Sequence, residues 1–153
     1  MVRRVAPILA ACASAVLFVQ AASPSTSLSG PGVIRITSKQ IEYKRVDFGA
    51  PGLTPGDVEI TRELLYNTRI RQKPIGHSQL VCVYVGAHFR NCNGTYVLPA
   101  GKITVSGAVQ YRSLYGLAVT GGTDRYDNVK GTLTVTLLEP NPRSSVVVFR
   151  LVV

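Results

Sequence analysis

The sequence contains no tryptophan, one methionine and three cysteines, and only 8 of its 153 residues are Asp or Glu. Charged residues make up 16% of the chain and hydrophobic residues 46%, so the composition excludes an intrinsically disordered protein. Cys82 and Cys92 lack CxxC spacing, and His77 and His88 form no ligand pattern, which argues against a metal site. No convincing long helical stretch is present. What the chain has instead is a series of short, alternating apolar segments.

The longest apolar run, residues 5–19, lies near the N-terminus and is short for a membrane span. It follows Arg3 and Arg4, and small or apolar residues then place a cleavage site after Ala21. This layout predicts a secretory signal peptide at residues 1–21 and no membrane span in the mature protein.

The prediction continues with a polar linker at residues 22–32 and a single folded domain at residues 33–153. Cleavage would remove Cys12 and leave Cys82 and Cys92 as an even pair in an oxidising compartment, which predicts a disulfide between them. Eleven residues from one cysteine to the other fit two strands and a turn, so the bridge would join a hairpin. An alternative is lipid anchoring at Cys12, because LAAC is similar to a bacterial lipoprotein box.

The formal net charge is +9, but the basic residues are scattered except for RIRQK at residues 69–73. No basic stripe interleaved with aromatic residues appears, so the charge does not indicate nucleic-acid binding. We interpret it as the solvated surface of a secreted protein.

Almost every segment after residue 32 alternates with period two, which predicts about eight strands separated by turn signals. Loops rich in Pro, Gly or Ser are expected at residues 49–56 and 139–145. The predicted strand segments are residues 33–37, 41–48, 57–67, 80–85, 94–101, 102–111, 115–121, 131–139 and 146–153.

Eight antiparallel strands with one apolar face favour an all-β fold that closes into a small barrel, because closure removes exposed sheet edges. The last segment, residues 146–153, is apolar on both faces except for Arg150. It is expected to close the barrel against the first strand or to lie in a subunit interface, and a buried Arg150 would need a partner.

The glycine-rich stretch GGTDRYDNVKG, residues 121–131, lacks Walker spacing and precedes a strand instead of a helix. Gly and Asn adopt positive φ readily, so we interpret the stretch as a tight corner and not as a phosphate loop.

The segment that contains this corner carries a family resemblance. KITVSGAVQYRSLYGLAVTGGTDRYDNVKGTLTV, residues 102–135, resembles the signature half of the allene oxide cyclase barrel family, and more loosely the plant dirigent proteins. Upstream, PGD, LLY, PIG and VCV follow in the expected order, so the resemblance covers about residues 33–138. Its most specific part is LAVTGGT. The secretion signal and the cysteine pair are more similar to secreted bacterial members.

The resemblance implies an eight-stranded antiparallel barrel with an apolar interior, no cofactor, and self-association, since the plant enzymes form oligomers. Plant members convert a fatty-acid allene oxide into a cyclopentenone mainly by moulding the bound chain. A first-strand glutamate and a polar cluster holding a water assist them. Dirigent relatives orient phenoxy radicals without a redox centre. Both activities rest on positioning a ligand in a dry cavity.

Transferred residue by residue, the resemblance yields two catalytic candidates, Glu42 and Glu63. The segment aligned with the family's glutamate offers Ser38, and Glu42 lies four residues further on. The family's asparagine before LY falls on Glu63, which either binds water or acts as a base inside the barrel, or faces solvent. Cys82 falls on a pocket-lining cysteine of the family.

Three tyrosines, Tyr66, Tyr84 and Tyr96, are candidates for lining a ligand cavity, with simple packing as the alternative. The sequence predicts a secreted barrel that binds or templates a small apolar molecule. The alternatives are an isomerase that cyclises an apolar epoxide, a dirigent-like guide protein using Asp57 or Asp124, and a structural or protein-binding barrel without a ligand. A carboxylate facing a cavity would favour the enzyme.

Overall fold

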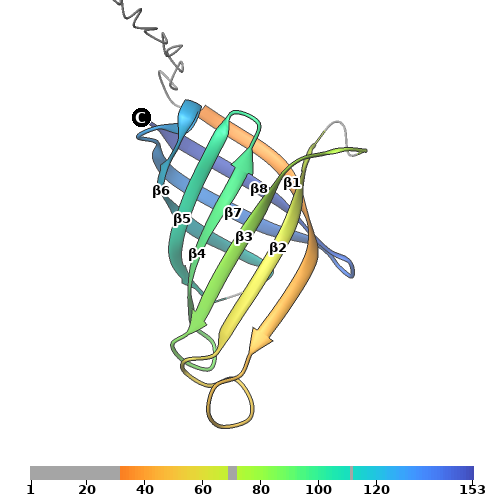
Figure 1. The fold of residues 1–153 in the computed structure, drawn as a ribbon, viewed down its shortest axis with the longest axis vertical. Helices are drawn as coiled ribbons and strands as arrows, with labels where there is room; N and C mark the ends of the chain where they lie inside the picture. Colours follow the sequence, from red (N-terminus) through yellow and green to blue (C-terminus); the bar gives the residue numbers. More distant parts are fainter. Residues whose placement is uncertain (1–31, 69–71, 111) are drawn as a thin grey trace, which may run out of the picture.

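The computed structural model describes residues 32–68, 72–110 and 112–153. The predicted signal peptide, Cys12 and all but the last residue of the predicted linker lie outside the described residues. Eight antiparallel strands follow one another around a closed barrel, each paired with the next, and the last strand pairs with the first (Figure 1). The strands are β1 (Gly32–Val46), β2 (Val58–Asn67), β3 (Pro74–Tyr84), β4 (Arg90–Leu98), β5 (Gly101–Val109), β6 (Leu114–Gly122), β7 (Lys130–Pro140) and β8 (Arg143–Val152).

The predicted all-β barrel and its closure by the last strand are therefore confirmed. The two segments predicted at residues 33–37 and 41–48 form one long strand, β1, with a β-bulge between Gln40 and Glu42. Arg150 is exposed on the outer face of β8 beside Thr134, so it is not the buried charge that the sequence suggested.

The antiparallel order places the connections of the barrel at two ends. The β1–β2, β3–β4, β5–β6 and β7–β8 connections share one end, called here the loop end (Figure 1). The opposite end carries a short 3₁₀ helix, η1 (Asp124–Tyr126), between β6 and β7. Tyr126 and Val129 are buried under this turn, so they close the η1 end of the barrel.

The glycine-rich stretch forms this corner between two strands, as predicted. Asn128 has a φ of 59° and Gly131 a φ of 138°. Glycine adopts positive φ readily because it has no Cβ, and asparagine is the residue that most often accompanies it near 59°. A Cβ at Gly131 would also overlap the carbonyl oxygen of Arg150 on β8. Two independent constraints therefore require glycine at position 131.

Replacing Gly131 with alanine is expected to lower the free energy of unfolding by about 3 kcal/mol, because the variant must strain its backbone and push β8 away. Gly121→Ala is the matched control, since its Cβ would have ordinary van der Waals contact with Thr104 Oγ1 at 3.6 Å. Urea unfolding of both variants checks this. Equal stability of the two would contradict the stated role of Gly131.

The Cys82–Cys92 disulfide joins directly paired positions of β3 and β4, with an S–S distance of 2.06 Å, which confirms the predicted hairpin bridge. Both cysteines are buried inside the barrel. Reduction is expected to lower stability by about 2.5 kcal/mol, because the bridge constrains a short loop of the unfolded chain. Urea unfolding with and without reductant measures the effect, and an unchanged midpoint would contradict it.

The barrel interior divides into two halves along its axis. Toward the η1 end it is apolar and tightly packed, and Tyr96 and Phe149 meet there edge to face with ring centroids 5.1 Å apart. Fully or almost fully buried members of this half are Ile36, Leu65, Tyr96, Ile103, Val119, Leu133, Val147, Phe149 and Leu151. Toward the loop end the inward side chains are largely polar, which differs from the expected apolar interior.

Candidate functional site

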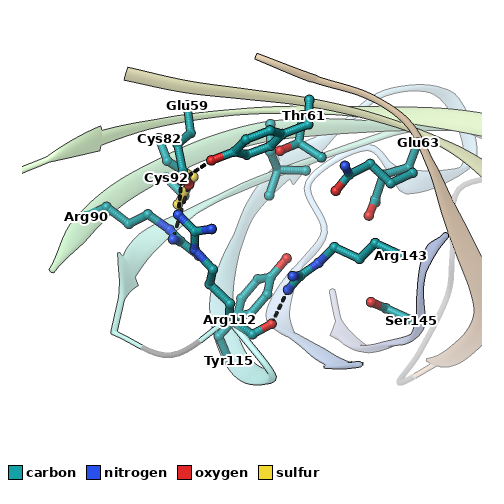
Figure 2. Close-up of a pocket in the computed structure, with 13 residues that line it drawn as sticks. Glu59, Thr61, Glu63, Cys82, Arg90, Cys92, Arg112, Tyr115, Arg143 and Ser145 are labelled. Carbon is teal, nitrogen blue, oxygen red and sulfur yellow. Dashed lines mark hydrogen bonds and ion pairs between the residues drawn. A yellow bond between two sulfur atoms is a disulfide. The ribbon is translucent and has the colours of Figure 1, made fainter. Parts of the chain in front are cut away.

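The polar half of the barrel contains a partly open cavity of about 50 Å³, lined by side chains from six strands and the β5–β6 connection (Figure 2). This volume holds a few water molecules. The lining residues are Gln40, Tyr43, Glu59, Thr61, Glu63, Leu80, Cys82, Arg90, Cys92, Arg112, Tyr115, Arg143 and Ser145. We call this space the polar cavity.

At the loop end of the cavity, Glu59 on β2 is the centre of a group of charged and phenolic side chains. It is only 4% exposed, and its Oε1 accepts hydrogen bonds from the hydroxyls of Tyr43 at 2.6 Å and Tyr84 at 2.8 Å. Arg90 Nη1 lies 3.1 Å from Glu59 Oε2, and Arg112 donates to Oε1. These five residues, the Glu59 cluster, close the mouth of the cavity.

Deeper in the cavity, Glu63 is a second buried carboxyl on the same face of β2. Ser38 Oγ donates to its Oε1 at 3.2 Å and Ser78 Oγ to its Oε2 at 2.8 Å. Burial away from water raises the pKa of Glu63, and the two serine hydrogen bonds and the charge of Arg143 offset part of this effect. A carboxyl with a raised pKa exchanges a proton closer to neutral pH than an exposed glutamate does.

Tyr115 and Arg143 form the wall of the cavity near Glu63. Burial raises the pKa of Tyr115, and the nearby negative charge of Glu63 adds to this effect, so its hydroxyl stays protonated at neutral pH. Figure 2 shows the Arg143 side chain extending from β8 into the cavity toward Tyr115. A buried carboxyl, a neutral phenol and a guanidinium therefore line the same cavity.

The two carboxylates predicted as catalytic candidates lie in different places. Glu63 lines the cavity and is only 8% exposed, which excludes the solvent-facing alternative. Glu42 is exposed on the outer face and pairs with Arg62 at 2.9 Å. The bulge after Gln40 adds one residue to the alternation, so Tyr43 and not Glu42 takes the next inward position on β1.

The three tyrosines predicted to line a ligand cavity lie in three different parts of the barrel. Tyr84 joins the Glu59 cluster at the mouth. Tyr96 packs in the apolar half, and its buried hydroxyl has no hydrogen-bond partner among the described residues. Tyr66 lies on a groove of the outer surface with Lys39 and Gln72, so it does not face the polar cavity.

Sequence reasoning missed six charged or phenolic residues of the site: Tyr43, Glu59, Arg90, Arg112, Tyr115 and Arg143. One signal was available, because Glu59 and Glu63 fall on the same side of a segment that alternates with period two. Alternation alone does not tell which side of a strand faces the barrel interior.

The Glu59 cluster separates the polar cavity from a wider hollow of about 380 Å³ outside the mouth. Tyr43, Arg90 and Arg112 line both spaces. Of the two arginines in the cluster, Arg112 is the more accessible, with 43% of its side chain exposed against 10% for Arg90. Movement of Arg112 would connect the cavity with the outer hollow.

The two acidic loop residues considered for a dirigent-like role lie at opposite ends of the barrel. Asp57 shapes the β1–β2 loop by accepting hydrogen bonds from the backbone N–H groups of Phe48 at 2.9 Å and Thr54 at 3.0 Å. The bond from Phe48, followed by that from Thr54, lowers the pKa of Asp57. Asp124 opens η1 at the far end, so the two do not form one site.

Among residues 32–68, 72–110 and 112–153, no group of three His, Cys, Asp or Glu side chains is arranged to hold a metal ion. No helix in this part of the chain is long and apolar enough to cross a membrane.

Fold and site together define a small closed antiparallel barrel with a polar cavity at one end. No known protein-family profile matches the sequence, and no curated protein matches it. Solved structures do match. A pyocyanin demethylase is 26% identical with a TM-score of 0.69, and the alignment covers 78% of this chain and 99% of that one.

Two further neighbours share the fold at lower identity. A Diels-Alderase from Streptomyces koyangensis is 16% identical with a TM-score of 0.64, over 78% of this chain and 63% of that chain. A pterocarpan synthase dirigent protein is 10% identical with a TM-score of 0.60, over 82% of this chain and 86% of that chain. The chain thus has the cyclase-like, dirigent-like barrel fold that its sequence resembled.

Proposed function

We propose that this chain is a secreted small-molecule enzyme in which Glu63 exchanges a proton with a ligand bound in the polar half of the barrel. The observation that carries the proposal is the placement of Glu63. Its carboxyl is buried at the wall of a cavity, its pKa is raised, and a guanidinium and a neutral phenol lie nearby. Such a group serves as a general acid or base near neutral pH.

The neighbouring side chains support this role chemically. Ser38 and Ser78 fix the orientation of the Glu63 carboxyl through their hydroxyls. Arg143 would stabilise negative charge that develops on a ligand when Glu63 removes a proton, because its guanidinium lines the same cavity as Glu63. A positioned acid or base of this kind typically contributes about 100- to 10,000-fold to a rate.

Ligand entry requires the mouth to open. The polar cavity of about 50 Å³ is well below the ~300 Å³ at which small-molecule sites begin. Arg112 emerges from the short β5–β6 connection and is the most accessible arginine of the Glu59 cluster. We assign it the part of a plug whose displacement joins the cavity to the hollow outside.

Fold similarity to a Diels-Alderase and a dirigent protein supports a role in shaping a small ligand. The polar lining modifies the expectation from sequence, since it favours a ligand with polar groups over a wholly apolar one. The disulfide and the N-terminal sequence pattern support secretion, because disulfides persist in oxidising compartments.

Demethylation is a second candidate reaction. It is favoured by the 26% identity to a pyocyanin demethylase over 78% of this chain. Incubation with pyocyanin, followed by mass spectrometry of the small molecule, tests it. A demethylated phenazine formed together with formaldehyde, whose oxygen comes from water and whose two electrons reduce the phenazine ring, would establish demethylation. Unchanged pyocyanin would remove this candidate.

Native mass spectrometry of the protein purified from its own host, without detergent, tests the proposed function. We expect a bound small molecule whose chemical class can be determined after release. A protein that is bare and also fails to bind added pyocyanin would contradict a ligand site.

A further inference from the structure

The described residues that line the polar cavity carry more positive than negative charge. Three arginines, Arg90, Arg112 and Arg143, face two carboxyls, Glu59 and Glu63 (Figure 2). Clefts lined by charge of one sign concentrate ligands of the other sign, because water screens partly buried charges less than exposed ones.

Glu59 is already shared between two of these cations. Arg90 pairs with its Oε2 at 3.1 Å, and Arg112 pairs with its Oε1. One carboxylate cannot neutralise two guanidinium groups, so the Glu59 cluster retains a net positive charge.

Arg143 has no carboxylate within ion-pair distance among the described residues. Among the described residues, its side chain donates a hydrogen bond to the backbone carbonyl oxygen of Arg112, which leaves most of its donors uncommitted. Glu63, the other acid nearby, is held by the hydroxyls of Ser38 and Ser78 instead.

The opposite wall offers a further free donor. The Nε of Arg90 is buried and has no hydrogen-bond partner among the described residues. A buried donor without a partner carries a free-energy cost that an incoming acceptor relieves.

We infer that the ligand of this site is an organic acid, whose carboxylate or phenolate oxygen binds to Arg143 and the Arg90–Arg112 side of the cavity. The inference rests on the proposed function, because it names the substrate class of the same site. A guanidinium presents paired N–H donors that match a carboxylate, so the geometry suits a small aromatic acid packed against Tyr115.

The test compares two pairs of probes that have the same shape and differ in charge: benzoate with benzamide, and 2-naphthoate with 2-naphthamide. Isothermal titration calorimetry of the full secreted protein is expected to show each acid binding at least tenfold more tightly than its amide, about the effect of one charge-assisted hydrogen bond. Arg143→Gln is expected to remove this preference, and Arg143→Lys to restore part of it.

Arg150→Gln is the matched control, because Arg150 is exposed on the outer face of the same strand. It should keep the full preference for the acids. Circular dichroism identifies any variant that fails to fold, and the wild-type comparison of acid with amide stands without the variants.

Acids that bind no better than their amides, or fail to bind, would overturn the inference. If native mass spectrometry then still finds a small molecule on the protein, the proposed function survives and only the preference for acids fails. If the protein is bare as well, both fail.

Discussion

Replacing Glu59 with glutamine is expected to lower the free energy of unfolding by about 3–5 kcal/mol, the cost of leaving a buried charge without its partner. Arg90 is 90% buried at its side chain and has Glu59 as its ion-pair partner. The amide keeps one acceptor oxygen for Tyr43 and Tyr84, so the loss reports the missing charge more than the missing hydrogen bonds.

Glu42→Gln is the matched control for this prediction. Glu42 and Arg62 form an exposed ion pair on the outer face, with 48% and 53% of their side chains accessible. Exposed pairs contribute little, so this variant should lose about 0.5 kcal/mol or less. Urea unfolding near neutral pH compares the two. Similar losses in both variants would show that the Glu59 cluster does not hold the barrel mouth together.

Glu63 is expected to have a large effect on how the stability of the protein depends on pH. The pKa of Glu63 is raised in the folded state above its ordinary value of 4.5, mainly by burial. At a pH between 4.5 and the raised pKa, Glu63 is protonated in the folded protein but ionised in the unfolded chain. The free energy of unfolding therefore falls as pH rises through this window. At a pH above the raised pKa, each unit by which the pKa is raised lowers the free energy of unfolding by about 1.4 kcal/mol.

Glu63→Gln removes this titration, so the variant should gain stability relative to wild type as pH rises. Urea unfolding of both proteins at about pH 4 and about pH 8 measures the difference. Asp57→Asn should show the opposite trend at lower pH, because the lowered pKa of Asp57 stabilises the fold above the ordinary pKa of 3.8 and this stabilisation is lost as pH falls below it. This variant is therefore compared with wild type from about pH 5 down to about pH 2. A stability difference between Glu63→Gln and wild type that is independent of pH would contradict a buried, titrating Glu63.

Much of the barrel could be predicted from alternation and turn chemistry. The period-two pattern of residues 57–67 gave the strand β2, the spacing of Cys82 and Cys92 gave their hairpin, and the glycine-rich corner after β6 gave the turn that η1 occupies. These features are local, and each is set by side-chain sterics within one strand or one turn.

The polar half could not be predicted in the same way. The bulge after Gln40 reverses which residues of β1 face inward, and the alternation of apolar residues in this segment does not predict a bulge. Arg112 reaches the cavity from the β5–β6 connection and Arg143 from the start of β8, so their meeting with Glu59 and Glu63 depends on closure of the whole barrel. A polar interior also departs from the usual burial of apolar groups, and such departures concentrate at functional sites.

The two halves of the barrel interior therefore have different roles. The apolar half, sealed by Tyr126 and Val129, stabilises the fold through packing. The polar half, linked by the disulfide and closed by the Glu59 cluster, can then hold groups that would be costly in an ordinary core.

The proposed function requires that Glu63 takes part in converting a molecule held in the polar cavity. The most direct measurement is the identity of the small molecule that remains bound to wild type and to Glu63→Gln, both purified from the protein's own host and analysed by native mass spectrometry followed by chromatography of the released compound. We expect Glu63→Gln to retain an unconverted precursor, whereas wild type carries or has released its product. The same molecule in both proteins, or none in either, would contradict it.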